Sequence, residues 1–142
     1  MIKQIVVGVD SSDTAFAAAH RAAELASALD ADLTVMTAFG KFERETVTLG
    51  GETFVFSTEH DARTLAASVV NRLRTEFPSA RMKADAEEGK PGEALVRLAD
   101  FLRADLIVVG NKRAQGLTRV LGSIARDVTA HANCDVYVAH TV

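Results

Sequence analysis

The amino-acid sequence predicts an α/β fold, in which a doubly wound, five-stranded parallel sheet of Rossmann-like type is flanked by four helices. Three observations predict it. Short apolar runs rich in β-branched residues are typical of strands buried on both faces of a parallel sheet. Segments with apolar residues at helical spacing separate these runs. No linker, low-complexity tract or internal repeat divides the 142 residues, so we expect a single domain over 1–142.

Five segments are expected to form the sheet. Four of them are the apolar runs 5–9, 33–38, 106–109 and 136–139. The fifth, 81–88, alternates Met82, Ala84 and Ala86 with charged residues. This alternation suits an edge strand better than a central one, because charged side chains discourage pairing with other chains.

Four helices are expected between the strands. In the first, small apolar residues form one stripe, which indicates close packing on the sheet: Ala15, Ala18, Ala19, Ala22, Ala26 and Leu29. The second is the most regular; it begins with a capping-box pattern at 58–61 and stops at Pro78. The third follows Pro91-Gly92, and the fourth follows Gly122-Ser123.

The segment between Gly40 and Ser57 does not fit this alternation. Residues 45–49 and 52–56 flank Gly50-Gly51, a pattern that predicts a hairpin. A connection this long in a compact domain is usually functional or mobile. We interpret it as a surface excursion beside the ligand crevice.

Composition narrows the partners and the compartment. The net charge is −3 and the pI is about 5.8, which argues against nucleic acid or an anionic membrane as the main partner. No apolar run reaches the ~20 residues that span a bilayer, and no signal-peptide pattern follows Met1. The one cysteine, Cys134, excludes an internal disulfide; it leaves the redox compartment open, though a reducing one fits. We therefore expect a cytoplasmic protein.

The first candidate site is the end of the first strand, Val9-Asp10-Ser11-Ser12. In open α/β sheets, ligands bind beyond the carboxyl ends of the strands, where the strand order reverses. There Asp10 is expected to accept hydrogen bonds from a ribose hydroxyl or an adenine amine. The alternative is that Ser11 or Ser12 caps the first helix and that Asp10 and Asp13 complement its dipole.

The second candidate is the loop 110–123, GNKRAQGLTRVLGS. Gly110 allows the backbone to approach a ligand closely. The last helix should begin at Gly122 and Ser123, so that free N–H groups and a hydroxyl converge where a phosphate would bind. The spacing matches neither a Walker A loop nor the dinucleotide fingerprint. A flexible turn followed by a helix cap is the alternative.

No catalytic or metal site is indicated. The histidines lack the spacing of metal ligands, and no serine stands in a G-x-S-x-G motif. We interpret His20 as a residue on a helix face and Cys134 as a core thiol.

Three stretches together resemble the universal stress protein family over the whole chain. They are IVVGVDSSDTAFAAAHRAAELA, with an Asp after the first strand and a Ser shortly after it; EEGKPGEALVRLADFLRADLIVVGNK, with a Gly-x-Pro turn before the third helix; and RVLGSIARDVTAHANCDVYVAHT, with a Gly-Ser helix start and a Cys-led last strand. Three matches in the family's order are more specific than any one of them.

The resemblance implies a sheet ordered 3-2-1-4-5 and a homodimer paired through the last strand. For one branch of the family it also implies ATP binding by a motif G-x2-G-x8/9-G-[S/T]. Asp10 would then contact adenosine, and Ala38 would offer a backbone contact to adenine. The other matching positions are Val9 beside Asp10, the first motif glycine Gly110, and the terminal pair Gly122 and Ser123.

Arg113 stands where the motif has its second glycine. A bulky residue there is strained by about 1–3 kcal/mol if the left-handed conformation is kept. Its side chain either fills the phosphate pocket or turns its guanidinium back to the phosphates, in a loop that also holds Lys112 and Arg119. A solvated basic loop is the third interpretation. We favour the phosphate-facing arrangement and include Arg113 among the site residues.

Two functions are consistent with this sequence. The first is a stress-response protein that binds ATP or a related adenine nucleotide and acts as a homodimeric sensor or signalling module toward unknown protein partners. The second is a dimeric protein-interaction module of the same family that binds no nucleotide. An enzyme is not indicated: no general base is placed, so ATP hydrolysis would at most be slow.

Overall fold

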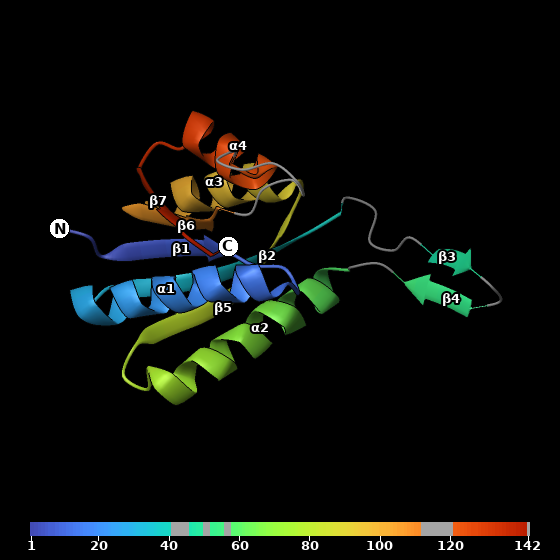
Figure 1. Cartoon of the computed structure of the whole chain (residues 1–142), viewed down its shortest axis with the longest axis horizontal. Coiled ribbons are helices and arrows are strands. Elements are labelled where there is room, and N and C mark those ends of the chain that lie inside the picture. The colour runs from blue at the N-terminus through green and yellow to red at the C-terminus, as the bar shows by residue number, and fades with distance from the viewer. Residues whose placement is uncertain (41–45, 50–51, 56–57, 112–120, 142) are drawn as a thin grey trace.

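The structure, a computed structural model, describes residues 1–40, 46–49, 52–55, 58–111 and 121–141. Within them, five parallel strands form one sheet: β1 (Gln4–Gly8), β2 (Asp32–Phe39), β5 (Arg81–Glu88), β6 (Leu106–Gly110) and β7 (Asp135–Ala139). The strands lie in the order β5-β2-β1-β6-β7 (Figure 1). Counted along the chain this order is 3-2-1-4-5, which confirms the predicted fold and the edge position of 81–88.

The register brings the carboxyl ends of three central strands together. Gly8 of β1 pairs with Met36 of β2, and Val7 pairs with Val108 of β6. The first strand ends one residue earlier than predicted, at Gly8. Val9 is still tied to the sheet, because its N–H donates to the carbonyl oxygen of Met36 at 2.8 Å.

The helices of the described residues cover both faces of the sheet (Figure 1). On one face lie α1 (Asp13–Leu29) and α2 (Glu59–Glu76), and on the other lie α3 (Pro91–Leu102) and α4 (Ser123–His131). The chain therefore changes faces between β5 and β6, and the strand order reverses between β1 and β6. None of these helices is long and apolar enough to cross a membrane.

Two apolar cores join the layers. Along β1, Ile5 and Val7 pack with residues of α1 and α2, whereas Val6 packs with residues of α3 and α4. The buried side chains of α1 are small, which confirms its predicted close packing on the sheet: Ala18, Ala19, Ala22, Ala23 and Ala26.

Leu29, expected on the same stripe, is 44% exposed. It is the last residue of α1, and Asp30 ends the helix there in the left-handed conformation (φ 55°).

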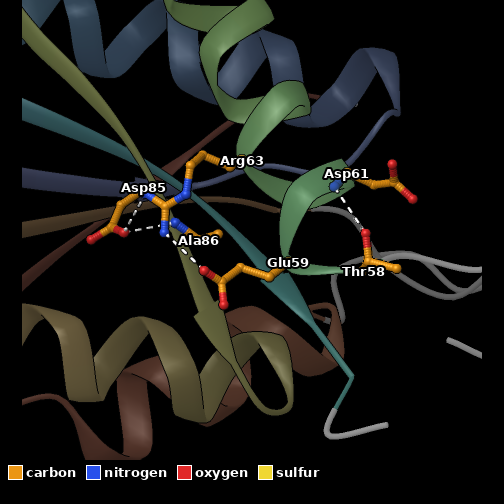
Figure 2. Close-up of polar contacts among 6 residues, drawn as sticks. All are labelled: Thr58, Glu59, Asp61, Arg63, Asp85 and Ala86. Carbon is orange, nitrogen blue, oxygen red and sulfur yellow. Dashed lines mark hydrogen bonds and ion pairs between the residues drawn. The ribbon is translucent and has the colours of Figure 1, made fainter. Parts of the chain in front are cut away.

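The first turn of α2 ties that helix to the edge strand β5 (Figure 2). Thr58 is the N-cap residue, and its hydroxyl accepts a hydrogen bond from the Asp61 N–H at 3.2 Å, as the capping-box pattern predicts. Arg63 reaches from α2 to the carboxylate of Asp85 on β5 (3.6 Å) and to that of Glu59 (3.4 Å). These side chains are partly exposed, so the ion pairs contribute little to stability.

The predicted hairpin forms a small sheet of its own. In it, β3 (Thr46–Leu49) pairs antiparallel with β4 (Glu52–Val55), and Leu49 lies opposite Glu52 (Figure 1). Residues 45 and 56, which the sequence pattern included in the two strands, lie outside the described residues.

Candidate functional site

A cavity of about 600 Å³ lies at the carboxyl ends of β1, β2 and β6. Ala15 and Ala18 of α1 line it on one face of the sheet, and Leu95 of α3 and Ala125 of α4 line it on the other. Its volume falls within the ~300–1,000 Å³ of typical small-molecule sites. The cavity therefore occupies the point where the strand order reverses, which is where open α/β sheets bind ligands.

Most residues that the sequence singled out meet at this cavity. Six of the seven line it, and they come from four separate segments of the chain: Val9, Asp10, Ala38, Gly110, Gly122 and Ser123. The seventh, Arg113, lies outside the described residues.

Asp10 forms part of a local hydrogen-bonded turn at the start of α1. Its carboxylate accepts bonds from the N–H of Ser12 at 2.8 Å and from the Ser12 hydroxyl at 2.5 Å. The Ser12 hydroxyl in turn accepts a bond from the Ala15 N–H at 3.2 Å and caps α1. The helix-cap interpretation of this segment is therefore confirmed for Ser12. It does not exclude a ligand, since Asp10 is exposed and also lines the cavity.

The start of α4 provides the cavity with donor groups. Gly122 is the N-cap residue and has extended backbone angles (φ −64°, ψ 164°) without a side-chain cap bond. The N–H groups of a first helical turn lack partners within the helix and carry the positive end of its dipole. No acidic residue stands in this first turn, and both Ser123 and Arg126 line the cavity. This end of the cavity is suited to an anion.

Gly110 is needed for its size. Its φ lies outside the left-handed range, so the conformational freedom of glycine is not used here. A Cβ atom on residue 110 would lie 3.2 Å from the hydroxyl oxygen of Thr141 and 3.7 Å from the Cβ of Ala18. Gly110 therefore lets Thr141, the second residue after β7, pack against the end of β6.

Several contributors to the site escaped the sequence analysis, among them Arg126 at the start of α4. Thr37 lines the cavity at 5% exposure, and its hydroxyl has no hydrogen-bond partner within the described part of the chain. Thr141 also lines the cavity and is held by Asn111. None of them carries a local signal: a threonine in a β-branched run reads as a strand residue, and the contact of Asn111 with Thr141 spans thirty positions.

The chemistry of the cavity follows from these groups. Its aliphatic walls suit a flat apolar body, whereas the uncapped start of α4 suits an anionic group. The residues present thus fit a nucleotide.

Two other reactive side chains, those of His20 and Cys134, do not line the cavity. On the α1–α2 surface, Nε2 of His20 lies 2.6 Å from the carboxylate of Glu76. Cys134 is half-buried beside the second core, and burial together with nearby Asp100 raises the pKa of its thiol. A raised pKa lowers the fraction of reactive thiolate. Within the described residues, no group of three or more His, Cys, Asp or Glu side chains could hold a metal ion.

Comparison with known proteins gives one consistent family. The model of the universal stress protein family matches residues 1–140. The universal stress protein Rv1636 of Mycobacterium tuberculosis is 33% identical over 150 residues, which cover 98% of this chain and 97% of the relative.

Solved structures agree with this match. A universal stress protein in complex with cAMP is similar with a TM-score of 0.77 and 27% identity, over 99% of this chain and 98% of that chain. The universal stress protein from Archaeoglobus fulgidus in complex with dAMP is similar with a TM-score of 0.67 and 28% identity, over 97% of this chain and 98% of that chain.

Proposed function

The chain belongs to the universal stress protein family, and we propose that it binds an adenine nucleotide in the cavity at the carboxyl ends of β1, β2 and β6. One observation carries this proposal: six predicted residues, from Val9 to Ser123, converge on a single cavity of about 600 Å³. The ligand class is supported by the relatives, since solved structures similar to this chain hold cAMP and dAMP.

The adenosine is proposed to lie at the ends of β1 and β2. The carbonyl of Met36 points toward β1, where it accepts the Val9 N–H. The main-chain N–H and C=O groups of successive strand residues point to alternate sides, so those of Ala38 point to the same side as those of Met36. Ala38 lies beyond Met36, the last residue of β2 that pairs with β1, so these groups face the space beyond the end of β1. This direction supports the proposed backbone contact of Ala38 to adenine, and the Asp10 carboxylate is proposed as an acceptor for the ribose.

The phosphates are proposed to lie at the start of α4. With no side-chain cap from Gly122, the N–H groups of the first turn are available to phosphate oxygens, and Ser123 adds a hydroxyl. Of the adenine nucleotides we favour ATP, because the loop that precedes this helix contains three cations, Lys112, Arg113 and Arg119. In this arrangement Arg113 turns its guanidinium to the phosphates.

The identity of residue 113 favours a second candidate function. If the Arg113 side chain fills the phosphate pocket, the chain acts without nucleotide, as a dimeric protein-interaction module of the same family. The two functions share the fold and differ only in the occupancy of the cavity, so a substitution of Arg113 separates them.

We also propose a homodimer paired through β7. This strand is the sheet edge opposite to β5, so its outer backbone groups have no partner strand in the described residues. Val136 and Val138, which are partly buried against the second core, make this edge strand apolar, and such strands pair readily with another strand. A two-fold contact between copies would use the same strand on both. The dimer would act in the stress response as a sensor, reporting nucleotide occupancy to protein partners.

Mass spectrometry of small molecules released by denaturing the purified protein tests the nucleotide proposal. We expect an adenine nucleotide from the wild-type chain and much less of it from an Asp10→Ala variant. Release of a metabolite of another class, retained equally by both chains, would contradict the proposal.

A further inference from the structure

The residues that leave β7 are fastened to Asn111 by three hydrogen bonds. The N–H of Asn111 donates to the carbonyl oxygen of Ala139 at 3.0 Å. Its side-chain oxygen, Oδ1, accepts the N–H of Thr141 at 2.8 Å and the Thr141 hydroxyl at 3.1 Å. Both side chains are half-buried, which strengthens hydrogen bonds relative to bulk water.

This tether sets the position of one wall of the cavity. Thr141 lines the cavity, whereas Asn111 does not. Thr141 also lies against Gly110, with its hydroxyl 3.2 Å from the place of a Cβ on that residue. A shift of Thr141 would therefore open the cavity between the end of β6 and α1.

The pairing of β6 with β7 does not need this tether. Five residue pairs, from Leu106 with Asp135 to Gly110 with Ala139, already fix the register. The side-chain bonds of Asn111 come after the last of these pairs. Their remaining effect is local: they hold Thr141 in place beside the cavity.

From this geometry we propose that Asn111 is a positioning residue of the ligand site, which acts through Thr141 and links the end of the edge strand β7 to the cavity. The inference rests on the proposed nucleotide function. Asn111 makes no contact with the ligand itself; it keeps the ligand in the cavity by holding the wall that Thr141 forms.

The test compares adenosine binding to the wild type, Asn111→Ala and Asn111→Asp. Adenosine is used because it carries no charge that would respond to a new carboxylate. Asn111→Ala removes the acceptor and is expected to weaken adenosine binding roughly tenfold, mainly through faster dissociation. Asn111→Asp keeps an acceptor oxygen at the same place and is expected to bind adenosine as the wild type does. Amide hydrogen exchange at Thr141 without ligand should become faster in Asn111→Ala only.

A matched control uses the asparagine at the other end of β7. Asn133 also forms a side-chain tether, to the carboxylate of Asp100 at 3.1 Å, but it lies away from the cavity. Asn133→Ala should leave adenosine binding unchanged. Thr141→Val, which removes one hydroxyl at constant shape, supplies a milder variant that is expected to fold and to bind less tightly than the wild type.

The outcomes separate the two proposals. If the wild type binds adenosine and Asn111→Ala binds it equally well, the role of Asn111 is overturned while the nucleotide function stands. Equal weakening in Asn111→Ala, Asn111→Asp and Asn133→Ala would show a general loss of structure and would also overturn it. If the wild-type chain binds neither adenosine nor ATP, the proposed function fails, and the inference fails with it.

Discussion

Gly92 of α3 packs directly against Asp127 of α4: a Cβ atom on residue 92 would lie only 2.8 Å from the Cβ of Asp127. Real Cβ atoms essentially never approach so closely. The glycine thus permits the close approach of the two helices that cover one side of the cavity.

We therefore predict that Gly92→Ala lowers the free energy of unfolding by about 1–3 kcal/mol, the usual cost of overpacking. The loss is expected although alanine is the better helix former. Urea unfolding measures it. In an Asp127→Gly background the contacted Cβ is gone, and the same substitution should become neutral or stabilising; an equal loss in both backgrounds would contradict the contact.

Asp105 fastens the start of β1 to the start of β6. Its carboxylate oxygen Oδ2 accepts the N–H groups of Lys3 (2.8 Å) and Gln4 (3.0 Å), and these bonds lower the pKa of Asp105 below its usual value. A carboxyl with a lowered pKa in the folded state stabilises the fold above its unfolded pKa of about 3.9. That contribution is lost as the pH falls through the folded pKa.

Asp105→Asn is therefore expected to destabilise the protein at pH 7, and the difference from the wild type should shrink as the pH falls below about 4. Urea unfolding across this pH range measures the difference. Asp135→Asn, a change at an exposed carboxyl at the same end of the sheet, serves as the control. A difference from the wild type that stays constant with pH would rule out the stabilising role of the charge.

The proposed dimer predicts a change in assembly. Val138→Lys places a charge on the apolar edge strand β7 and should give a monomer in sedimentation experiments, whereas the wild type should sediment as a dimer. Lys83→Glu changes a charge on the opposite edge strand, β5, and should leave the dimer intact. Far-UV circular dichroism must show that both variants are folded. A dimeric, folded Val138→Lys would exclude β7 as the interface.

Arg113→Gly distinguishes an Arg113 side chain that binds phosphate from one that fills the phosphate pocket. If the guanidinium binds phosphate, the variant should bind ATP more weakly, with a smaller loss for adenosine, because only ATP carries the phosphate charge. Titration with both ligands measures this difference. Tighter binding would show that the Arg113 side chain obstructs the pocket, and binding that occurs only in the variant would show that the natural protein acts without nucleotide.

The alternation of apolar runs with helical stripes was sufficient to predict the elements of the sheet, and the family resemblance supplied their order. Two helix ends were not predictable in the same way. Asp30 and Arg103 end α1 and α3 in the left-handed conformation (φ 55° for both), where sequence reasoning expects glycine. Backbone hydrogen bonds close both ends, from the Ala31 N–H to the Ala26 carbonyl oxygen (2.9 Å) and from the Ala104 N–H to the Ala99 carbonyl oxygen (2.8 Å). The residue types at 30 and 103 do not predict this geometry.

The candidate site was predictable where residues follow a strand end or begin a helix, as Asp10 and Ser123 do. It was not predictable where the site depends on distant contacts. Thr141 lines the cavity and is bonded to Asn111, thirty positions earlier. The role of Gly110 could not be read from its loop either, since its small size accommodates that same Thr141.

Calorimetric titration of ATP and adenosine into the wild type, Asp10→Ala and Ser123→Ala tests most directly whether the cavity binds an adenine nucleotide in the proposed orientation. The wild type should bind ATP at one site per chain. Asp10→Ala should weaken the binding of both ligands by about 1–3 kcal/mol, and Ser123→Ala should weaken ATP by a similar amount while leaving adenosine unaffected. No saturable binding of ATP to the wild type, or wild-type affinity for ATP in both variants, would contradict the proposed site.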